Sequence, residues 1–230
     1  MKDVRFYFEI PGCFTSTGIG SILCSIICIY LQLQFNIMDG FQWNQIISRF
    51  PHIAERIFDG LDGNTGFQYA CKSGHDELVE LMIKKSVELN IDLIAKDRHG
   101  KNGYHYACES GHVKIVELLI KNSVECNINL NAKDRGDSGR TGFHFACSSG
   151  QVKVVKILIK NSVECKINLN AKNGDGKTGF HYAFESGRIE LVKVLIKNSV
   201  EFNIDLNVKD RDGKTVVFIM PVVVLNLLSY

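Results

Sequence analysis

Histidine and cysteine, two residue types that bind metal ions and act in catalysis, recur as a pair in this sequence. His105 stands three residues before Cys108, and His144 stands three residues before Cys147. Residues three apart on a helix share one face, so each pair could supply two ligands to a zinc ion. A zinc site needs further ligands, but the sequence has no Cys-x-x-Cys pair and no His-x-x-x-His pair. We therefore expect no metal site.

Both pairs belong to a longer pattern, because the middle of the chain consists of four near-copies of one segment. Equivalent alanines in the copies are separated by 37, 39 and 37 residues. The copies begin at Thr65, Asn102, Thr141 and Thr178. A fixed period of this size indicates a solenoid, in which each unit buries its apolar face against its neighbours. A histidine that recurs at one position of the unit, as His105, His144 and His181 do, is therefore expected to be structural.

Each copy predicts two helices followed by an extended arm. In the fourth copy, Thr178 is a favourable N-cap residue and Gly187 is a typical helix stop. The next segment has the apolar spacing of an amphipathic helix, at Ile189, Leu191, Val192, Leu195, Ile196 and Val200. Residues 204–208 alternate between apolar and polar side chains and lead into a tight turn at 210–213.

This unit resembles the ankyrin repeat. The resemblance covers about residues 64–214 and rests on the opening Thr-Gly-Phe-His-Tyr-Ala, the Ser-Gly between the helices, Leu-Val-Lys-Val-Leu-Ile in the second helix and Asn-Val-Lys-Asp-Arg-Asp-Gly in the arm. It implies an all-α fold, an ankyrin-type helix-turn-helix solenoid with extended arms and β-turn tips between repeats. It also implies that the repeated histidine joins backbone hydrogen bonds between neighbouring units.

The units depart from the ankyrin pattern in two ways. Glycine follows the opening residue where the family usually has proline, as at Gly142, and this should loosen each helix start by up to about 1 kcal/mol. The period is 37 residues, whereas that of the family is about 33. The difference is about one helical turn, so we expect a longer second helix in each unit. The additional residues at 135–139 predict an enlarged turn.

Aromatic residues and cysteines also keep fixed positions in the copies. Aromatic residues should fill the space between adjacent units at Phe67, Tyr104, Phe143 and Phe180. Free thiols are expected at Cys71, Cys108, Cys147, Cys126 and Cys165. Equivalent cysteines should lie about 10 Å apart at helix packing distances, beyond disulfide reach. Reduced thiols, together with the lack of any Asn-x-Ser/Thr sequon, favour the cytoplasm, with the nucleus as an alternative.

Other chemistries are not indicated by the sequence. No Walker-type phosphate loop, Gly-x-Ser-x-Gly motif or His-Glu-x-x-His motif occurs, so we expect neither an enzyme nor a cofactor. The formal net charge is +2 and both signs alternate along the helices, so nucleic acid is not an expected partner. With 45% hydrophobic and 23% charged residues, the composition fits one soluble domain.

The expected function is therefore non-catalytic: a scaffold or adaptor that binds partner proteins through the concave face of the repeats. In the ankyrin family, binding residues come from the arm tips and from the end of the first helix. Carried over position by position, the resemblance implies partner-binding residues at Arg98, His99, Lys101, Glu109, Ser110, Arg135, Asp137, Arg140, Ser148, Ser149, Asp175, Lys177, Glu185, Arg211 and Asp212.

The first 38 residues allow several interpretations. No charged residue lies between Ile10 and Met38, and a run of this length could cross a bilayer. A membrane anchor at 10–38, and hence a membrane-tethered scaffold, is one interpretation. A poorly ordered or non-native start and a segment packed on the first repeat are the others, and the anchor is not favoured.

The segments that flank the repeats are less regular. Residues 39–63 predict an N-terminal cap helix, and their part 50–62 resembles the opening helix of an F-box, a module that docks adaptors onto cullin-type ubiquitin ligases. A substrate adaptor of such a ligase is therefore an alternative function. Residues 215–230 begin like a fifth unit and continue as an apolar tail, which predicts a truncated repeat.

Overall fold

The computed structural model of the protein describes residues 65–88, 91–135 and 138–216. All of them belong to Asp39–Tyr230, the second of two compact units into which the chain divides. The predictions for residues 1–63, for Asp137 and for the tail beyond Val216 concern residues outside these ranges.

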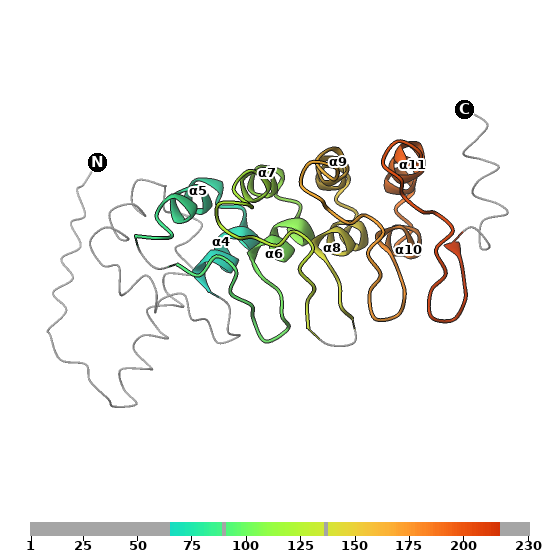
Figure 1. Ribbon diagram of the computed structural model, residues 1–230, viewed down its shortest axis with the longest axis horizontal. Coiled ribbons are helices and arrows are strands. Elements are labelled where there is room, and N and C mark those ends of the chain that lie inside the picture. Colours follow the sequence, from blue (N-terminus) through green and yellow to red (C-terminus); the bar gives the residue numbers. More distant parts are fainter. Residues whose placement is uncertain (1–64, 89–90, 136–137, 217–230) are drawn as a thin grey trace, which may run out of the picture. The chain divides into compact units, whose positions relative to one another are not determined.

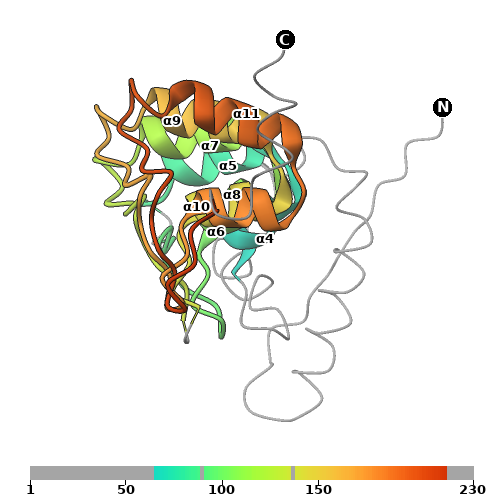
Figure 2. The same ribbon diagram turned by 90° about the vertical axis from the view of Figure 1, so that its right-hand side faces the viewer.

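The described residues form four pairs of helices, one pair for each predicted repeat (Figure 1). In chain order they are α4 (Gly66–Ser73) and α5 (Asp76–Lys84), α6 (Gly103–Ser110) and α7 (Val113–Lys121), α8 (Gly142–Ser149) and α9 (Val152–Lys160), and α10 (Gly179–Glu185) and α11 (Ile189–Asn198). The first helices of the pairs pack side by side in one layer and the second helices in another, and the arms project beyond the first layer (Figure 1 and Figure 2). The only β pairing within the described ranges is an isolated bridge between Lys209 and Thr215. The predicted all-α solenoid is confirmed.

Each first helix begins with a capping box, in which two side chains satisfy the free N–H groups of the first turn. The pairs are Thr65 with Gln68, Asn102 with His105, Thr141 with His144 and Thr178 with His181. In α6, the His105 N–H donates to Asn102 Oδ1 over 3.2 Å, and the Asn102 N–H donates to His105 Nδ1 over 3.1 Å. The repeated histidine therefore contributes to the start of its own helix.

The glycine that opens each first helix is required by packing between neighbouring repeats. A Cβ atom on Gly142 would lie 2.5 Å from Cε1 of Tyr104 and 3.0 Å from Sγ of Cys108, both in the preceding repeat. The same arrangement recurs at Gly103 and Gly179. These distances are well inside van der Waals contact, so no side chain fits. From the sequence we expected these glycines only to destabilise the helix starts. The structure shows that each one makes room for an aromatic ring of the preceding repeat.

The core lies between the two helix layers and between successive pairs. The predicted aromatic residues are buried, with exposed fractions of 1–2%, at Phe67, Tyr104, Phe143 and Phe180. All five described cysteines are free, and three are fully buried at Cys71, Cys108 and Cys147. Burial raises the pKa of the Cys108 thiol to about 12, so the thiol stays protonated and unreactive at neutral pH. The prediction of buried free thiols in the first helices is confirmed.

The second helix of a repeat does not extend through the extra residues. α7 ends at Lys121, and residues 122–127 form a separate turn. The turn closes at Asn127, whose φ of 51° is left-handed, and the Ile128 N–H donates to the Ser123 carbonyl over 2.8 Å. This bond is typical of a Schellman closure. The prediction of a longer helix is therefore wrong, because the backbone changes to a three-residue bond from the Ser123 N–H to the Ile120 carbonyl directly after α7.

The extra turn exposes one valine in each repeat. Val87, Val124, Val163 and Val200 have exposed fractions between 77% and 95%. Val200 lies beyond the end of α11, so its predicted place on the apolar face of that helix is wrong. Ile189, the first residue of α11, is also 57% exposed. The buried face of α11 consists of Leu191, Val192 and Leu195.

Candidate functional site

His105 and His144 join the first helices α6 and α8 to the arms that follow them. Nε2 of His105 lies 2.9 Å from the carbonyl oxygen of Ala132, and Nε2 of His144 lies 3.1 Å from that of Lys177. A carbonyl only accepts, so Nε2 carries the proton and Nδ1 is the acceptor in the capping box. Burial lowers the pKa of both imidazoles to about 4, so they are neutral at pH 7. The bond between neighbouring units predicted for these histidines is confirmed at His105 and His144, while His181 caps its own helix through Nδ1.

Neither a metal-binding cluster nor a membrane-spanning helix occurs among the described residues. Within them, no three or more His, Cys, Asp or Glu side chains lie together as a metal site would require. None of the described helices is long and apolar enough to span a membrane. The apolar segment 10–38 lies outside these residues.

Where the arms meet the first helices, cations alternate with aromatic rings. The ring of Phe145 has two cations within reach, with Lys101 Nζ 4.3 Å and Arg140 Cζ 4.5 Å from its centroid. Lys101 also lies 5.4 Å from the ring of Tyr106, and Arg140 lies 5.9 Å from that of Tyr182. Such distances are within the range of cation–π attraction. We call this set the cation–aromatic row: Lys72, Tyr106, Lys101, Phe145, Arg140 and Tyr182.

Two arm lysines beside these rings are neutralised by acids on the first helices. Lys101 Nζ lies 2.8 Å from Glu109 Oε2, and Lys177 Nζ lies 2.7 Å from Glu185 Oε1. The lysine side chains are only 16% and 28% exposed, so both pairs are partly shielded from water. The hydrogen bond to Glu185 raises the pKa of Lys177. These two cations therefore present little net charge to a partner.

Arg140 occupies the equivalent position at the end of the second repeat, but its surroundings differ. Ser148 stands where the second and fourth repeats have their acids. The Arg140 Nε lies 3.7 Å from Oδ2 of Asp134, in its own arm. Asp134 is also occupied by the Arg140 N–H, which donates to its Oδ1 over 2.6 Å. The guanidinium is 29% exposed and faces no acid on the first helix, so it is the least neutralised of the three arm cations.

A buried polar side chain at the base of each arm fixes the arm against the first helix. Asp97 is 3% exposed, and its carboxylate accepts from the Lys101 N–H over 2.8 Å and from the Tyr106 hydroxyl over 2.5 Å. Burial and this carboxylate raise the pKa of Tyr106, so its hydroxyl remains a donor. In the fourth repeat Asn173 takes the place of the acid and donates to the Tyr182 hydroxyl over 2.9 Å. The spacing between arm and helix is therefore set by buried hydrogen bonds.

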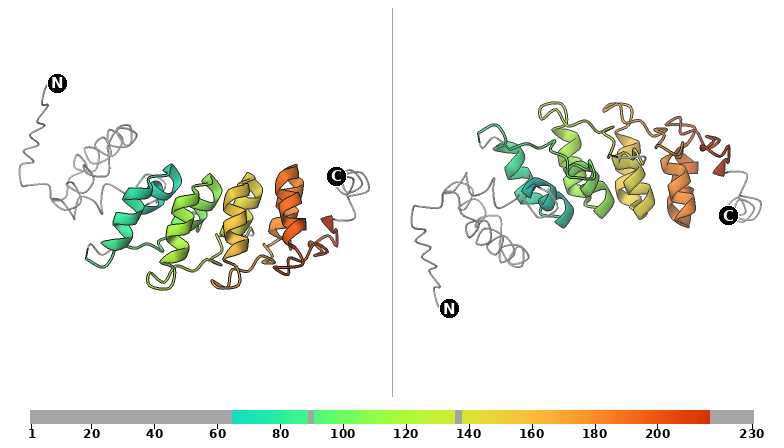
Figure 3. Two further views of the ribbon diagram at one scale, coloured as in Figure 1. Left: turned by 90° about the horizontal axis from the view of Figure 1, so that it is seen from above. Right: turned by 90° about the horizontal axis from the view of Figure 1, so that it is seen from below.

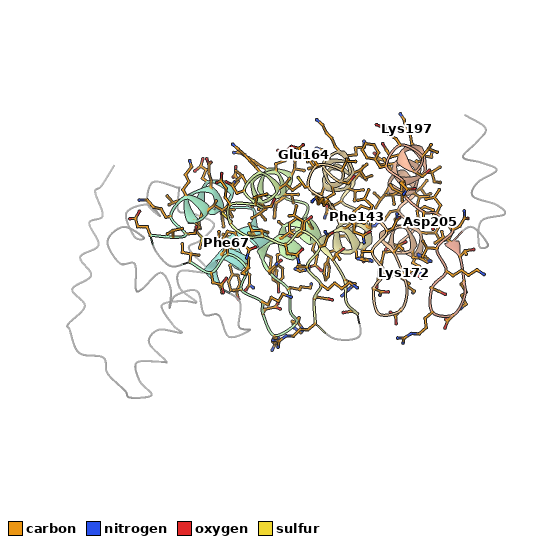
Figure 4. The ribbon with its side chains drawn as sticks, in the orientation of Figure 1. Phe67, Phe143, Glu164, Lys172, Lys197 and Asp205 are labelled. Atoms are coloured by element: carbon orange, nitrogen blue, oxygen red, sulfur yellow. The ribbon has the colours of Figure 1, made fainter. Side chains whose placement is uncertain are left out.

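Hydrogen bonds also connect neighbouring arms. At the tips, backbone N–H groups donate to carbonyls of the preceding arm over 2.7, 2.9 and 2.7 Å, from Arg135, Gly174 and Arg211. Along the arms, lysine ammonium groups donate to the carbonyl of the equivalent lysine one repeat further on, over 3.1, 2.9 and 3.3 Å, from Lys96, Lys133 and Lys172. Lys172 can be located among the arms in Figure 4. The arms therefore form a connected platform.

The structure places the predicted binding residues in two groups. The arm tips are exposed, at Arg98, His99, Arg135, Asp175, Arg211 and Asp212. The arm bases and helix ends are half-buried, at Lys101, Glu109, Ser110, Arg140, Ser148, Ser149 and Lys177, with Glu185 exposed. Within the second group, the charged residues form ion pairs or join the cation–aromatic row, whereas the three serines do neither and the tips remain apart.

The aromatic members of the row were not predicted as site residues. Tyr106, Phe145 and Tyr182 lie two positions after the buried core aromatics, and Tyr69 is their equivalent in the first repeat. A second aromatic position that recurs in all four copies was a usable signal. Lys72 was missed because its equivalents in the other copies are acids or serine.

The stacked helix pairs and their connected arms define a solenoid of the protein-interaction type. A family model described as ankyrin repeats, in three copies, matches residues 44–134 and again residues 124–210. The chain therefore belongs to the ankyrin-repeat family, and its repeats form a protein–protein interaction domain. No curated protein matches the chain significantly. The family match begins within segment 39–63, for which the cap helix and the F-box-like start stay predictions.

Proposed function

We propose that this protein is a non-catalytic scaffold or adaptor that binds a partner protein through its inner face. The inner face is defined as the cation–aromatic row together with the exposed arm tips. The free described cysteines support a reducing compartment such as the cytoplasm.

The rigidity of the arms supports this proposal. Tip-to-tip backbone bonds and the lysine bonds along the arms hold successive tips in place before any partner arrives. A surface that is ordered in advance loses little conformational entropy on binding, so more of the contact energy appears as affinity.

Arg140 is the observation that carries the proposal. Its guanidinium lies against the ring of Phe145 and faces no acid on the first helix, unlike the cations of the adjacent repeats. A stacked arginine keeps its donors in a fixed plane, which suits bidentate recognition of a carboxylate. Arginine and tyrosine are also the residue types that dominate binding energy in interfaces. We expect a partner to place an acidic side chain opposite Arg140.

One substitution tests this role without disturbing the core. Ser148→Glu places an acid where Glu109 and Glu185 stand in the neighbouring repeats, so Arg140 gains an ion-pair partner. Tagged full-length protein would be cross-linked in its native cells, purified and analysed by mass spectrometry. Partners cross-linked through Lys101 or Lys177 should be recovered about tenfold less with this variant, while its melting temperature stays equal or rises.

The control must carry the same change in net charge on the other side of the molecule. Lys153→Gln, on α9, removes one positive charge from the second-helix layer and should leave recovery unchanged. The double variant Arg98→Glu, Arg135→Glu reverses charge at two exposed tips and should also reduce recovery. If both inner-face variants retain the wild-type set of cross-linked partners, the proposal is wrong.

A further inference from the structure

The second-helix layer carries a groove on the face away from the arms. It lies between α9 and α11, which are neighbours in this layer (Figure 3, left). The groove has a volume of about 510 Å³, within the range of about 300–1,000 Å³ typical of ligand sites. Its charged rim contains four lysines, two from each helix: Lys156 and Lys160 from α9, and Lys193 and Lys197 from α11. Lys197 can be located at the top of α11 in Figure 4.

The four rim lysines outnumber the two acidic residues of the groove, Glu190 and Glu201. None of the four has an ion-pair partner among the described residues, and all four are exposed. On the corresponding face of the first two repeats, Lys84 pairs with Glu80 and Lys114 pairs with Asp76. Four like charges around one groove repel one another, and an anionic ligand that enters the groove relieves this repulsion.

The floor of the groove is apolar. Ile159 and Val194 contribute to it, and so does Phe202, in the extra turn after α11. Phe202 stands where the second and third repeats have Cys126 and Cys165. The phenyl ring is half-exposed, so the last junction offers a larger apolar surface than the equivalent positions of the preceding repeats.

We propose that this groove binds an acidic peptide segment of a partner protein, with an apolar side chain of the segment packed against Phe202. The lysines supply charge complementarity on both sides of a narrow floor, and the ring supplies an anchor that a phosphate backbone would leave unused. Two glutamates, Glu190 and Glu201, also line the groove; they disfavour a uniformly anionic ligand such as a polyphosphate. This surface is separate from the inner face and does not depend on the function proposed for it.

Direct titration tests the proposal. The probe is a fluorescein-labelled peptide, Asp-Glu-Asp-Leu-Phe-Glu-Asp-Glu, added to full-length protein and followed by fluorescence anisotropy. The double variant Lys160→Glu, Lys197→Glu should bind the probe at least about tenfold more weakly than wild type. Phe202→Cys, which installs the residue of the preceding repeats, should weaken binding by about threefold to tenfold.

The repeated fold provides a matched control. Lys84 and Lys121 occupy the same positions of α5 and α7 as Lys160 and Lys197 do of α9 and α11. Lys84→Glu with Lys121→Glu therefore makes the same change in net charge at the equivalent junction, and should leave the affinity within about twofold of wild type. Circular dichroism melts establish that both double variants fold, and Lys160→Gln with Lys197→Gln provides a milder version of the groove variant.

Three results would overturn the proposal. One is equal loss of binding in the groove variant and its matched control, which indicates non-specific attraction. Another is an unchanged peptide affinity in the Phe202→Cys variant, which would show that the ring does not anchor the peptide. The third is tighter binding of the same protein to polyphosphate, or to vesicles of phosphatidylserine and phosphatidylcholine, with no saturable peptide binding.

Discussion

The junction between the first two repeats and the two junctions after it share one arm geometry but differ in the bonds that connect the arms. In the later junctions an asparagine bridges to the next repeat. Asn131 donates to the Lys166 carbonyl over 2.8 Å and accepts from the Asn168 N–H over 2.8 Å. Asn170 makes the equivalent two bonds one repeat further on. At the first junction this position is Ile94, whose side chain is 43% exposed and makes no such bridge.

The bond between helix and arm differs at the same place. The later junctions use His105 and His144, each with one bond from Nε2 to an arm carbonyl. The first junction uses Gln68, whose Nε2 donates to the carbonyls of Ala95 and Lys101 over 2.7 and 3.1 Å. Both kinds of bond therefore differ at the first junction, while the helices of all four repeats stack in the same two layers.

Acid should produce the largest effect, because it protonates two buried imidazoles that join helix and arm at the later junctions. The pKa of His105 and of His144 is about 4 in the folded protein, against 6.5 ordinarily. The contribution of the neutral imidazoles to the free energy of unfolding is therefore complete above about pH 6.5. It is lost as the pH falls from there towards 4. Each shift corresponds to a loss on the order of 3 kcal/mol, whereas Gln68 does not titrate. Hydrogen exchange at low pH should show greater loss of protection in α8 and α9 than in α4 and α5.

The residue of the first junction supplies the control for this prediction. His105→Gln with His144→Gln should flatten the pH dependence of the free energy of unfolding between about pH 6.5 and 4. An unchanged pH dependence in that variant would show that other groups cause the acid sensitivity.

Substitution of an opening glycine should cause the second-largest loss of stability. The cause should be the same steric overlap at every junction that opens with glycine. Gly142→Ala forces a Cβ atom to 2.5 Å from the ring of Tyr104, and overpacking of this type costs about 1–3 kcal/mol. Urea denaturation would measure the loss. Gly103→Ala should cost less, because its nearest ring atom, in Phe67, is 2.8 Å away. Tyr104→Leu combined with Gly142→Ala should restore part of the stability; a fully additive double variant would refute the steric explanation.

Removal of one asparagine bridge should have a moderate effect. Asn131→Ala deletes two hydrogen bonds between repeats and should lower the free energy of unfolding by about 1–2 kcal/mol. Exchange of the Asn168 amide hydrogen should accelerate at the same time. Asn207 is the matched control, because it holds the equivalent position and bridges to no later arm within the described residues. Equal destabilisation by Asn207→Ala would mean that the bridge itself contributes nothing.

The smallest effect should be a gain in folding stability from a substitution at the first junction. Ile94→Asn places an amide where it can donate to the Asn127 carbonyl and accept from the Asn129 N–H, as its equivalents do. We expect stabilisation by about 0.5–1 kcal/mol in urea denaturation. Ile94→Ala removes the same exposed side chain without the amide and should give no gain; an equal gain would assign the effect to lost apolar exposure.

Most of the fold followed from the sequence because each repeat is a local unit. The position of the buried ring of Phe143 and the end of its helix at Gly150 are determined within one copy, and four copies in register repeat the signal. The turn at 122–127 did not follow, because its apolar residues continue the helical spacing while the chain has already left the helix. Lys166 takes the same left-handed conformation as Asn127, with φ of 53°, so residue type alone does not mark the turn.

The sequence indicated most of the charged members of the candidate site, but neither its aromatic members nor its ion pairs. Lys101 and Glu109 were both expected to bind a partner, yet the structure shows that they bind each other. Such a pairing depends on the angle between arm and helix, which the buried bond between Asp97 and Tyr106 sets across the repeat. The importance of Arg140 follows only from a comparison of its surroundings with those of its equivalents.

The contact between an opening glycine and the preceding aromatic ring also bears on how such a chain can evolve. Gly142 fits the ring of Tyr104, and Gly179 fits that of Phe143, so tyrosine and phenylalanine serve equally well. A tandem duplication of a whole unit would therefore insert a copy that matches its neighbours on both sides. A unit that opens with proline would bring ring atoms into the space left by the glycine after each of the first three repeats, whereas the fourth repeat is followed by Val216 at this position. Recombination among the copies can therefore change the length of the array without a steric conflict at the junctions that open with glycine.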